Sequence, residues 1–180
     1  VDVLVNNAGF GDWGPFHERD WTKNSDMVDL NVKALTKLTH FFLPKMVKRK
    51  NGKILNVAST AGFQPMPNLN IYAASKAFVI HFSEALAEEV SEHGVSVTVL
   101  CPGPTETRFK EVAGMSSSRV FQSGSVSSAK EVAEFGFQAL IQGQVIAIPG
   151  VVNKALMQAN RFVPRFLAAK IAKKLQGHPG

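Results

Sequence analysis

The chain has 180 residues, of which 45% are hydrophobic and 19% are charged, and its formal net charge is +6. This length and composition predict one soluble globular domain. The chain has no uninterrupted apolar run of about eighteen residues, which argues against a transmembrane helix. The single cysteine, Cys101, excludes an internal disulfide and is typical of a cytoplasmic protein.

The positive charge concentrates in two stretches, 45–53 and 161–174. Neither stretch interleaves basic side chains with the aromatic and base-reading side chains of a nucleic-acid site, so no nucleic-acid partner is predicted. His81 and His93 have no further metal-ligating side chains at a useful spacing, so no metal site is predicted either.

The first element is a short, β-branched and apolar stretch over 1–6, which predicts a buried strand. The small residues 7–9 end this strand and would let a ligand approach the backbone. A plain strand-ending turn is the alternative interpretation of these residues.

A long helix is predicted next, because apolar residues recur at helical spacing from Asp20 to about residue 50. Asp20 can cap its N-terminus, and Asn51-Gly52 would stop it. Pro44 should bend the helix or lie near its end. Asn31 falls in the middle of the pattern, where Asn is a modest helix former.

Two further strands, 53–58 and 95–100, flank a predicted helix over 72–93 that ends at Gly94. Ser59 lies at the carboxyl end of the first of these strands. The second is followed by a tight turn over 101–107, with the sequence CPGPTET.

Residues 108–127 are rich in serine and glycine and poor in large apolar side chains, which indicates a mobile segment and suggests a lid. Ser128-Ala-Lys-Glu131 is a capping box that should open a helix ending at Gln142. A last strand is predicted over 144–148.

The tail over 151–180 predicts two basic amphipathic helices divided at Pro164. Such helices can lie weakly on a membrane surface. The alternative is that they pack on the domain and keep a solvated basic face.

Four strands alternating with helices predict an α/β fold with a parallel sheet. Ligands collect outside the carboxyl ends of the strands in such sheets, and Asn7, Ser59 and Pro102 would all lie at that edge.

Tyr72 and Lys76 lie four residues apart, so on a helix they share one face. A neighbouring ammonium group favours tyrosinate and should lower the pKa of Tyr72. With a serine hydroxyl nearby, such a pair could move a proton on or off an alcohol or carbonyl.

Five features occur in a fixed order: NNAG at 6–9, Asn31, Ser59, the Tyr72-x-x-x-Lys76 pair, and Pro102-Gly103 with Thr107. Together they resemble the short-chain dehydrogenase/reductase family, up to about residue 150. The resemblance implies a Rossmann-type doubly wound parallel sheet and an oxidoreductase that interconverts a carbonyl and an alcohol. It also implies a homodimer or homotetramer formed through the helices 20–50 and 72–93.

The resemblance implies a role for each catalytic residue. Tyr72 would be the general acid in reduction and the general base in oxidation, while Lys76 would lower its pKa and hold the nicotinamide ribose. Ser59 would orient the substrate oxygen. Asn31 would help to hold a water in a proton relay that reaches Lys76, although an exposed polar position is its alternative interpretation. The cofactor, NAD or NADP, would contact Asn7, Ala8, Gly9, Tyr72, Lys76, Pro102, Gly103, Thr105 and Thr107.

The chain departs from the family in one respect, because no Gly-rich turn of the form T-G-x-x-x-G-x-G precedes NNAG. We therefore expect residues 1–150 to be the C-terminal part of a Rossmann domain and 151–180 to be a helical tail. The departure also leaves open a second function, that of a non-catalytic module for binding or dimerisation.

Overall fold

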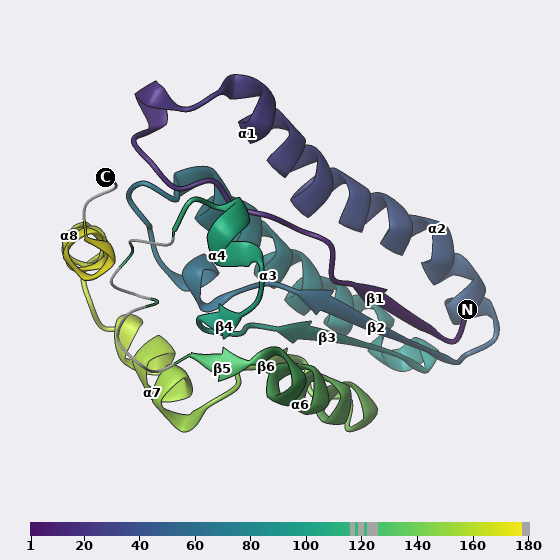
Figure 1. The fold of residues 1–180 in the computed structure, drawn as a ribbon. Coiled ribbons are helices and arrows are strands. Elements are labelled where there is room, and N and C mark those ends of the chain that lie inside the picture. The colour runs from purple at the N-terminus through teal and green to yellow at the C-terminus, as the bar shows by residue number, and fades with distance from the viewer. Residues whose placement is uncertain (116–117, 119–120, 122–125, 178–180) are drawn as a thin grey trace.

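The computed structural model describes residues 1–115, 118, 121 and 126–177. Figure 1 shows the order of the elements along the chain. The strands and α-helices are β1 (Val3–Asn6), α1 (Trp21–Val28), α2 (Leu35–Lys48), β2 (Gly52–Val57), α3 (Asn70–Val90), β3 (Val95–Leu100), β4 (Thr105–Glu106), α4 (Phe109–Val112), β5 (Ser127–Ser128), α6 (Ala129–Ile141), β6 (Ile146–Ala147), α7 (Val151–Asn160) and α8 (Arg165–Gln176).

The main sheet is parallel and has the strand order β1-β2-β3-β6. Val5 pairs with Leu55, and Val99 pairs with Ile146. This confirms the predicted α/β class and all four predicted strands. A second, two-residue parallel pair joins β4 to β5, and the sequence did not predict it because so short a pair has no periodicity.

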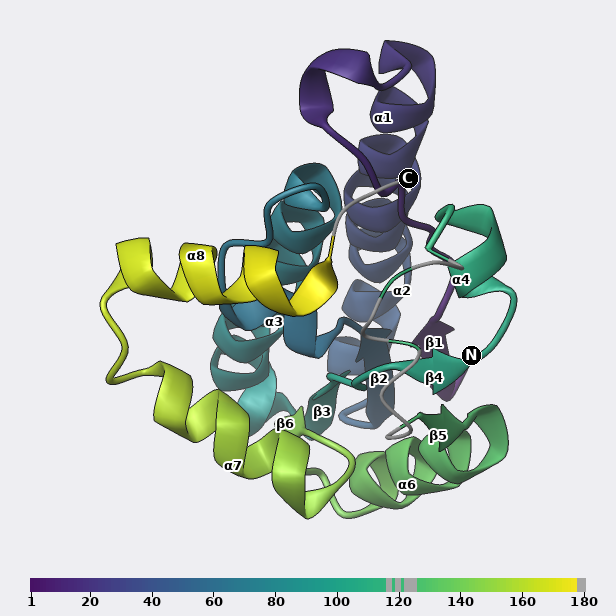
Figure 2. The ribbon, with the colours of Figure 1, turned by 60° about the vertical axis from the view of Figure 1, so that its left-hand side comes forward.

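The helices cover both faces of the main sheet (Figures 1 and 2). One core lies between the sheet and α2 with α3, where Met46, Ile54 and Val97 pack together. A second lies under α6, where Leu100 packs with Leu140. Because successive strand residues point to opposite faces, neighbours such as Ile54 and Leu55 serve different cores.

The predicted helix from Asp20 to about residue 50 is present, and Asp20 caps it by accepting from the backbone N–H groups of Thr22 and Lys23. The helix changes pitch between α1 and α2, where Asp29–Ala34 form a π-helical segment. A π turn holds one residue more than an α turn. Asn31 lies inside this segment and is only 1% exposed, so the interpretation of Asn31 as an exposed polar position is wrong.

Helix α3 begins at Asn70, two residues before the predicted start, and its last turn over Ser91–His93 is 3-10. Gly94 follows with φ +67°. A Cβ at Gly94 would collide with the Lys50 carbonyl oxygen. The position therefore requires glycine for its left-handed backbone and for the close approach of Lys50.

A buried polar network, which the sequence did not predict, connects two strands and two helices. Asn6 donates from Nδ2 to Asn56 Oδ1 at 2.8 Å and to Thr39 Oγ1 at 3.1 Å. Asn56 donates from Nδ2 to Ser83 Oγ at 2.9 Å. The four side chains join β1, β2, α2 and α3 where apolar residues would otherwise be expected.

The tail forms the two predicted helices, α7 and α8, with Pro164 between them. Asn160 donates from Nδ2 to the Phe63 carbonyl at 3.1 Å, and Ala168 and Ala172 of α8 are buried. Phe162 and Phe166 remain largely exposed. Among the described residues, no helix is long and apolar enough to cross a membrane.

Candidate active site

The carboxyl ends of β2 and β3 meet at one edge of the sheet, as predicted. The Ala58 N–H donates to the Leu100 carbonyl at 2.8 Å, and the Thr60 N–H donates to the Pro102 carbonyl at 2.9 Å. Ser59 Oγ also donates to the Pro102 carbonyl, at 3.4 Å, and accepts from the Ala61 N–H. The structure thus brings Ser59 and Pro102 together.

Lys76 lies one turn after Tyr72 on α3, and its ammonium group reaches the same edge of the sheet. Its Nζ donates to the Val57 carbonyl at 2.8 Å and lies 5.7 Å from the centroid of the Tyr72 ring. Only 5% of Lys76 is exposed. Burial lowers the pKa of Lys76 to about 8, so at neutral pH its ammonium form predominates but is easily deprotonated.

Tyr72 is 9% exposed and packs in an apolar cluster. The Phe109 ring lies 5.1 Å from it, measured between centroids. Burial raises the pKa of Tyr72 to about 12, and the Ser59 hydroxyl acts in the opposite direction. The expectation that Lys76 lowers this pKa is wrong for the buried phenol of this structure, because desolvation of the phenol dominates and Lys76 Nζ is bound to the Val57 carbonyl.

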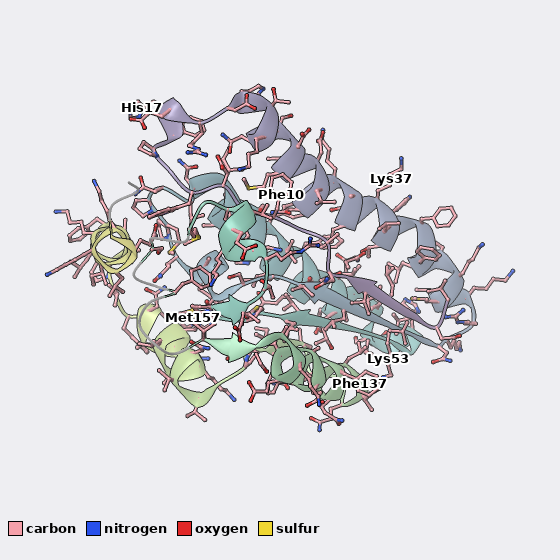
Figure 3. All side chains as sticks on the ribbon, viewed as in Figure 1. Phe10, His17, Lys37, Lys53, Phe137 and Met157 are labelled. Carbon is pink, nitrogen blue, oxygen red and sulfur yellow. The ribbon has the colours of Figure 1, made fainter. Side chains whose placement is uncertain are left out.

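Asn31 fastens the backbone that follows β1. Its Nδ2 donates to the Phe10 carbonyl at 3.0 Å and to Ser75 Oγ at 3.1 Å, while its Oδ1 accepts from the Phe10 N–H at 3.2 Å. Phe10 lies near α4 (Figure 3). The Asn31 amide thus holds the Phe10 backbone, next to Gly9, through both its nitrogen and its oxygen.

Gly9 lies between Asn31 and Lys76. A Cβ at this position would be 2.8 Å from Asn31 Oδ1 and 3.3 Å from Lys76 Nζ. Asn7, Ala8 and Gly9 are exposed at the edge of the sheet. These small, open residues leave room beside Lys76 for a bound molecule.

The turn after β3 is ordered by its own polar groups. Thr105 Oγ1 donates to the Gly103 carbonyl at 3.0 Å, and Thr107 Oγ1 accepts from the Phe109 N–H at 3.2 Å. Gly103 packs against the Asn153 side chain of α7, which a Cβ would meet at 2.8 Å. Thr107 is exposed and precedes α4.

The segment 108–127 contains residues that sequence reasoning missed. Helix α4 packs Phe109 over Tyr72, and Ala113 and Met115 are buried in the same cluster. The lid prediction also covers 116–117, 119–120 and 122–125, which lie outside the described residues. The sequence signal for this packing over Tyr72 was Phe109, a large aromatic side chain in a stretch with few others.

Cys101 is fully buried, and burial raises the pKa of its thiol to about 12. It is therefore a thiol rather than a thiolate nucleophile at neutral pH. Among the described residues, no group of three or more His, Cys, Asp or Glu side chains is placed to hold a metal ion.

Residues 1–116 match the family model described as short chain dehydrogenase. The chain belongs to this family. A curated relative of this short-chain dehydrogenase is the very-long-chain 3-oxoacyl-CoA reductase of Rattus norvegicus. It is 35% identical over 161 residues, which cover 87% of this chain and 51% of the relative.

Solved structures resemble the short-chain dehydrogenase over most of its length. A short-chain dehydrogenase from Sphingobium yanoikuyae in complex with NADPH is 27% identical, with a TM-score of 0.78, over 91% of this chain and 66% of that one. The 3-ketoacyl-(acyl-carrier-protein) reductase from Brucella melitensis with NADH is 26% identical, with a TM-score of 0.73, over 83% and 65%. The chain spans about half the length of several of the curated relatives it matches.

Proposed function

We propose that this short-chain dehydrogenase takes part in NAD(P)-dependent interconversion of a carbonyl and an alcohol. The observation that carries the proposal is the convergence of Ser59, Tyr72 and Lys76 at the carboxyl edge of the parallel sheet. Its relatives with bound NADPH or NADH support the same cofactor class.

In reduction, the nicotinamide supplies a hydride to the carbonyl carbon when it is bound. Tyr72 would give its phenolic proton to the carbonyl oxygen, and a pKa of about 12 keeps that proton in place across the neutral range. Ser59 would hydrogen-bond the same oxygen. Lys76 would return a proton to the phenolate, and a pKa near 8 suits it for that step.

The residues around Lys76 fit the nicotinamide half of such a cofactor. Gly9 leaves a gap that a Cβ would fill against Asn31 and Lys76. The exposed Asn7 and Ala8 continue this opening along the edge of the sheet. We assign the remaining contacts to the turn after β3, namely Pro102, Gly103, Thr105 and Thr107. Asn31 would hold the Phe10 backbone beside this opening.

The proposal predicts that the 180-residue chain binds NADPH or NADH saturably, through the residues that surround Lys76. Nicotinamide fluorescence measures the binding, and a Tyr72→Phe/Lys76→Ala variant, which should lose it, is the control. A 3-oxoacyl-CoA is the first carbonyl to screen, because the rat relative is named for that substrate.

Absence of binding at millimolar concentrations of both cofactors would contradict the proposal for this chain. It would favour the second candidate, a non-catalytic module for binding or dimerisation. The convergence of Ser59, Tyr72 and Lys76 favours catalysis, because a dimerisation module has no use for a buried ammonium group beside a phenol.

We also propose that the chain self-associates through the outer faces of α2 and α3. Phe41 is 63% exposed on α2, and Phe78 is 42% exposed on α3 beside Val32 and His40. Exposed large apolar side chains on adjoining helices are typical of a surface that binds another protein.

Sedimentation velocity should therefore show a dimer or larger species, and Phe41→Lys should shift it to the monomer. Phe137→Lys is the matched control, because Phe137 is 56% exposed on α6 and points away from the sheet (Figure 3). A wild-type chain that stays monomeric at high micromolar concentration would contradict this assembly.

A further inference from the structure

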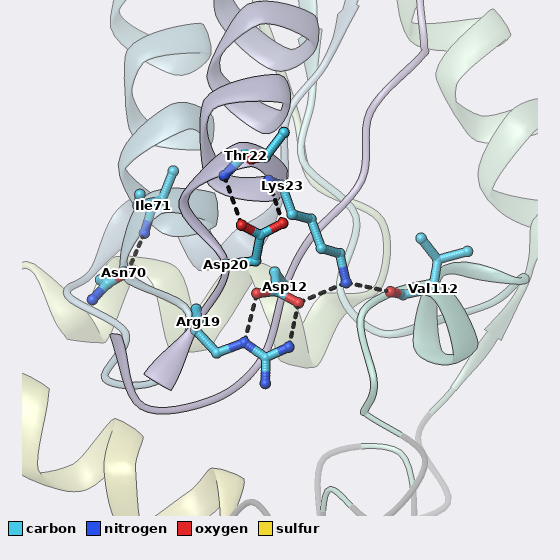
Figure 4. Close-up of polar contacts among 8 residues, drawn as sticks. All are labelled: Asp12, Arg19, Asp20, Thr22, Lys23, Asn70, Ile71 and Val112. Atoms are coloured by element: carbon cyan, nitrogen blue, oxygen red, sulfur yellow. Dashed lines mark hydrogen bonds and ion pairs between the residues drawn. The ribbon is translucent and has the colours of Figure 1, made fainter. Parts of the chain in front are cut away.

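Asp12 is a buried carboxylate held by two cations. Its side chain is 1% exposed. Arg19 donates to it from Nε at 2.7 Å and from Nη2 at 2.8 Å, and Lys23 Nζ donates to it at 2.7 Å (Figure 4). Burial would raise the pKa of Asp12, but the hydrogen bonds from Arg19 and Lys23 outweigh it and keep that pKa below its usual value. Asp12 is thus a carboxylate at neutral pH.

Lys23 connects this cluster to the end of α4. The same Nζ that binds Asp12 also donates to the Val112 carbonyl at 3.3 Å (Figure 4). The next carbonyl, that of Ala113, accepts from the Trp13 N–H at 2.9 Å. The last carbonyls of a helix have no partner within it, so Lys23 and Trp13 satisfy groups that α4 cannot satisfy itself.

Helix α4 is also the element that covers Tyr72. The Phe109 and Tyr72 rings are 5.1 Å apart, and Gly11 fits closely against both. A Cβ at Gly11 would lie 2.8 Å from the Phe109 ring and 3.3 Å from the Tyr72 ring. The loop that contains Asp12 therefore packs against α4 on one side and is bonded to its carboxyl end on the other.

We propose that Asp12, Arg19 and Lys23 form a latch that keeps α4 closed over Tyr72, and that Lys23 is a positioning residue controlling access to the phenol. Arg19 fixes the Asp12 carboxylate through two bonds, and the fixed carboxylate holds the Lys23 ammonium at the Val112 carbonyl. Entry of a carbonyl substrate requires α4 to move, which breaks the bond from Lys23. This role in gating rests on the proposed function, whereas the latch itself does not.

The latch can be tested directly because Tyr72 is the only tyrosine in the chain. Tetranitromethane nitrates accessible tyrosine, and mass spectrometry identifies the product. The reagent attacks the phenolate, which burial under α4 both shields and disfavours, so at one fixed pH the nitration rate of each variant reports the open fraction. We expect Lys23→Met to nitrate at least about tenfold faster than the wild type, because a bond from a charged donor is lost.

Three further variants complete the test. Phe109→Ala removes the covering ring and should nitrate fast. Lys130→Met, which removes the exposed ion pair with Glu134 on α6, should behave as the wild type. Lys23→Arg keeps a cation within reach of the Asp12 carboxylate and the Val112 carbonyl, and it should nitrate as slowly as the wild type. Slow nitration in this variant would show that the cation, and not the general stability of the fold, controls the rate.

Wild-type nitration rates in Lys23→Met, with fast nitration in Phe109→Ala, would overturn the latch. Slow nitration in Phe109→Ala would overturn the covering role of α4. If Lys23→Met does not fold by circular dichroism, Lys23→Gln takes its place with the same two readings. Nitration requires no cofactor, so these results stand apart from the cofactor titration that tests the proposed function.

Discussion

Replacement of Tyr72 by phenylalanine is expected to lower kcat/KM for carbonyl reduction by about a thousandfold while leaving cofactor binding in place. The variant keeps the ring that packs on Phe109 and removes only the phenolic proton. General acid catalysis by a positioned side chain contributes about 10²–10⁴ in rate. Nicotinamide absorbance follows the turnover, and fluorescence titration follows the binding.

Cofactor binding by the same variant is the internal control, because Tyr72→Phe leaves Lys76 intact. Since Lys76 Nζ still donates to the Val57 carbonyl, Tyr72→Phe should bind the cofactor as the wild type does. Retention of more than about a tenth of the wild-type kcat/KM would show that another group supplies the proton. Joint loss of binding and turnover would instead show that the phenol positions the cofactor.

The raised pKa of Tyr72 bears on the direction of the reaction. While α4 covers Tyr72, burial raises the pKa of the phenol to about 12 and so keeps it protonated at neutral pH. A protonated phenol suits a proton donor and hence reduction. Oxidation needs the phenolate, and a charged group near the ring or entry of water when α4 opens would stabilise it. Because Lys23 holds α4 in place, it would affect both the access of substrate to Tyr72 and the protonation of the phenol.

Local spacing predicted the parts of the site that one element or one strand end determines. Tyr72 and Lys76 share a helix face because four residues make about one turn. Ser59 and Pro102 meet because parallel strands end at the same edge of a sheet. These relations depend on the backbone alone, and sequence patterns indicate the backbone well.

The cover of the site could not be predicted in this way. Trp13 Nε1 donates to Gln176 Oε1 at 3.3 Å, across 163 positions of the chain, and Ser118 Oγ donates to the Gln176 carbonyl. No periodicity connects such residues. The pKa of Tyr72 was mispredicted for the same reason, because desolvation by Phe109 and its neighbours depends on tertiary packing.

The buried network around Asn56 was missed for a different reason. Asn56 lies in a strand that otherwise reads as apolar, and a polar residue there has no local signal that it is satisfied. In the structure it is fully buried, and it both accepts from Asn6 and donates to Ser83. The network connects β1 with α3, the helix that carries Tyr72 and Lys76.

Asn56→Ala is therefore expected to lower the free energy of unfolding by about 2–4 kcal/mol, because it leaves one buried N–H of the Asn6 amide without its acceptor, removes the hydrogen bond to Ser83 Oγ and leaves a cavity in the core. Urea unfolding followed by circular dichroism measures the change. Asn7→Ala is the matched control, because Asn7 is exposed although it directly follows the buried Asn6 in the chain. It should change the free energy of unfolding by less than about 0.5 kcal/mol.

The physical reason can be separated from simple loss of volume by adding Ser83→Ala. If the hydrogen bond between Asn56 and Ser83 is the main cost, the double variant should be less destabilised than the sum of the two single variants, because both changes remove the same bond. Strict additivity would show instead that Asn56 acts only by filling space between β2 and α3. The network would then not be what ties β1 and β2 to the helix that carries Tyr72 and Lys76.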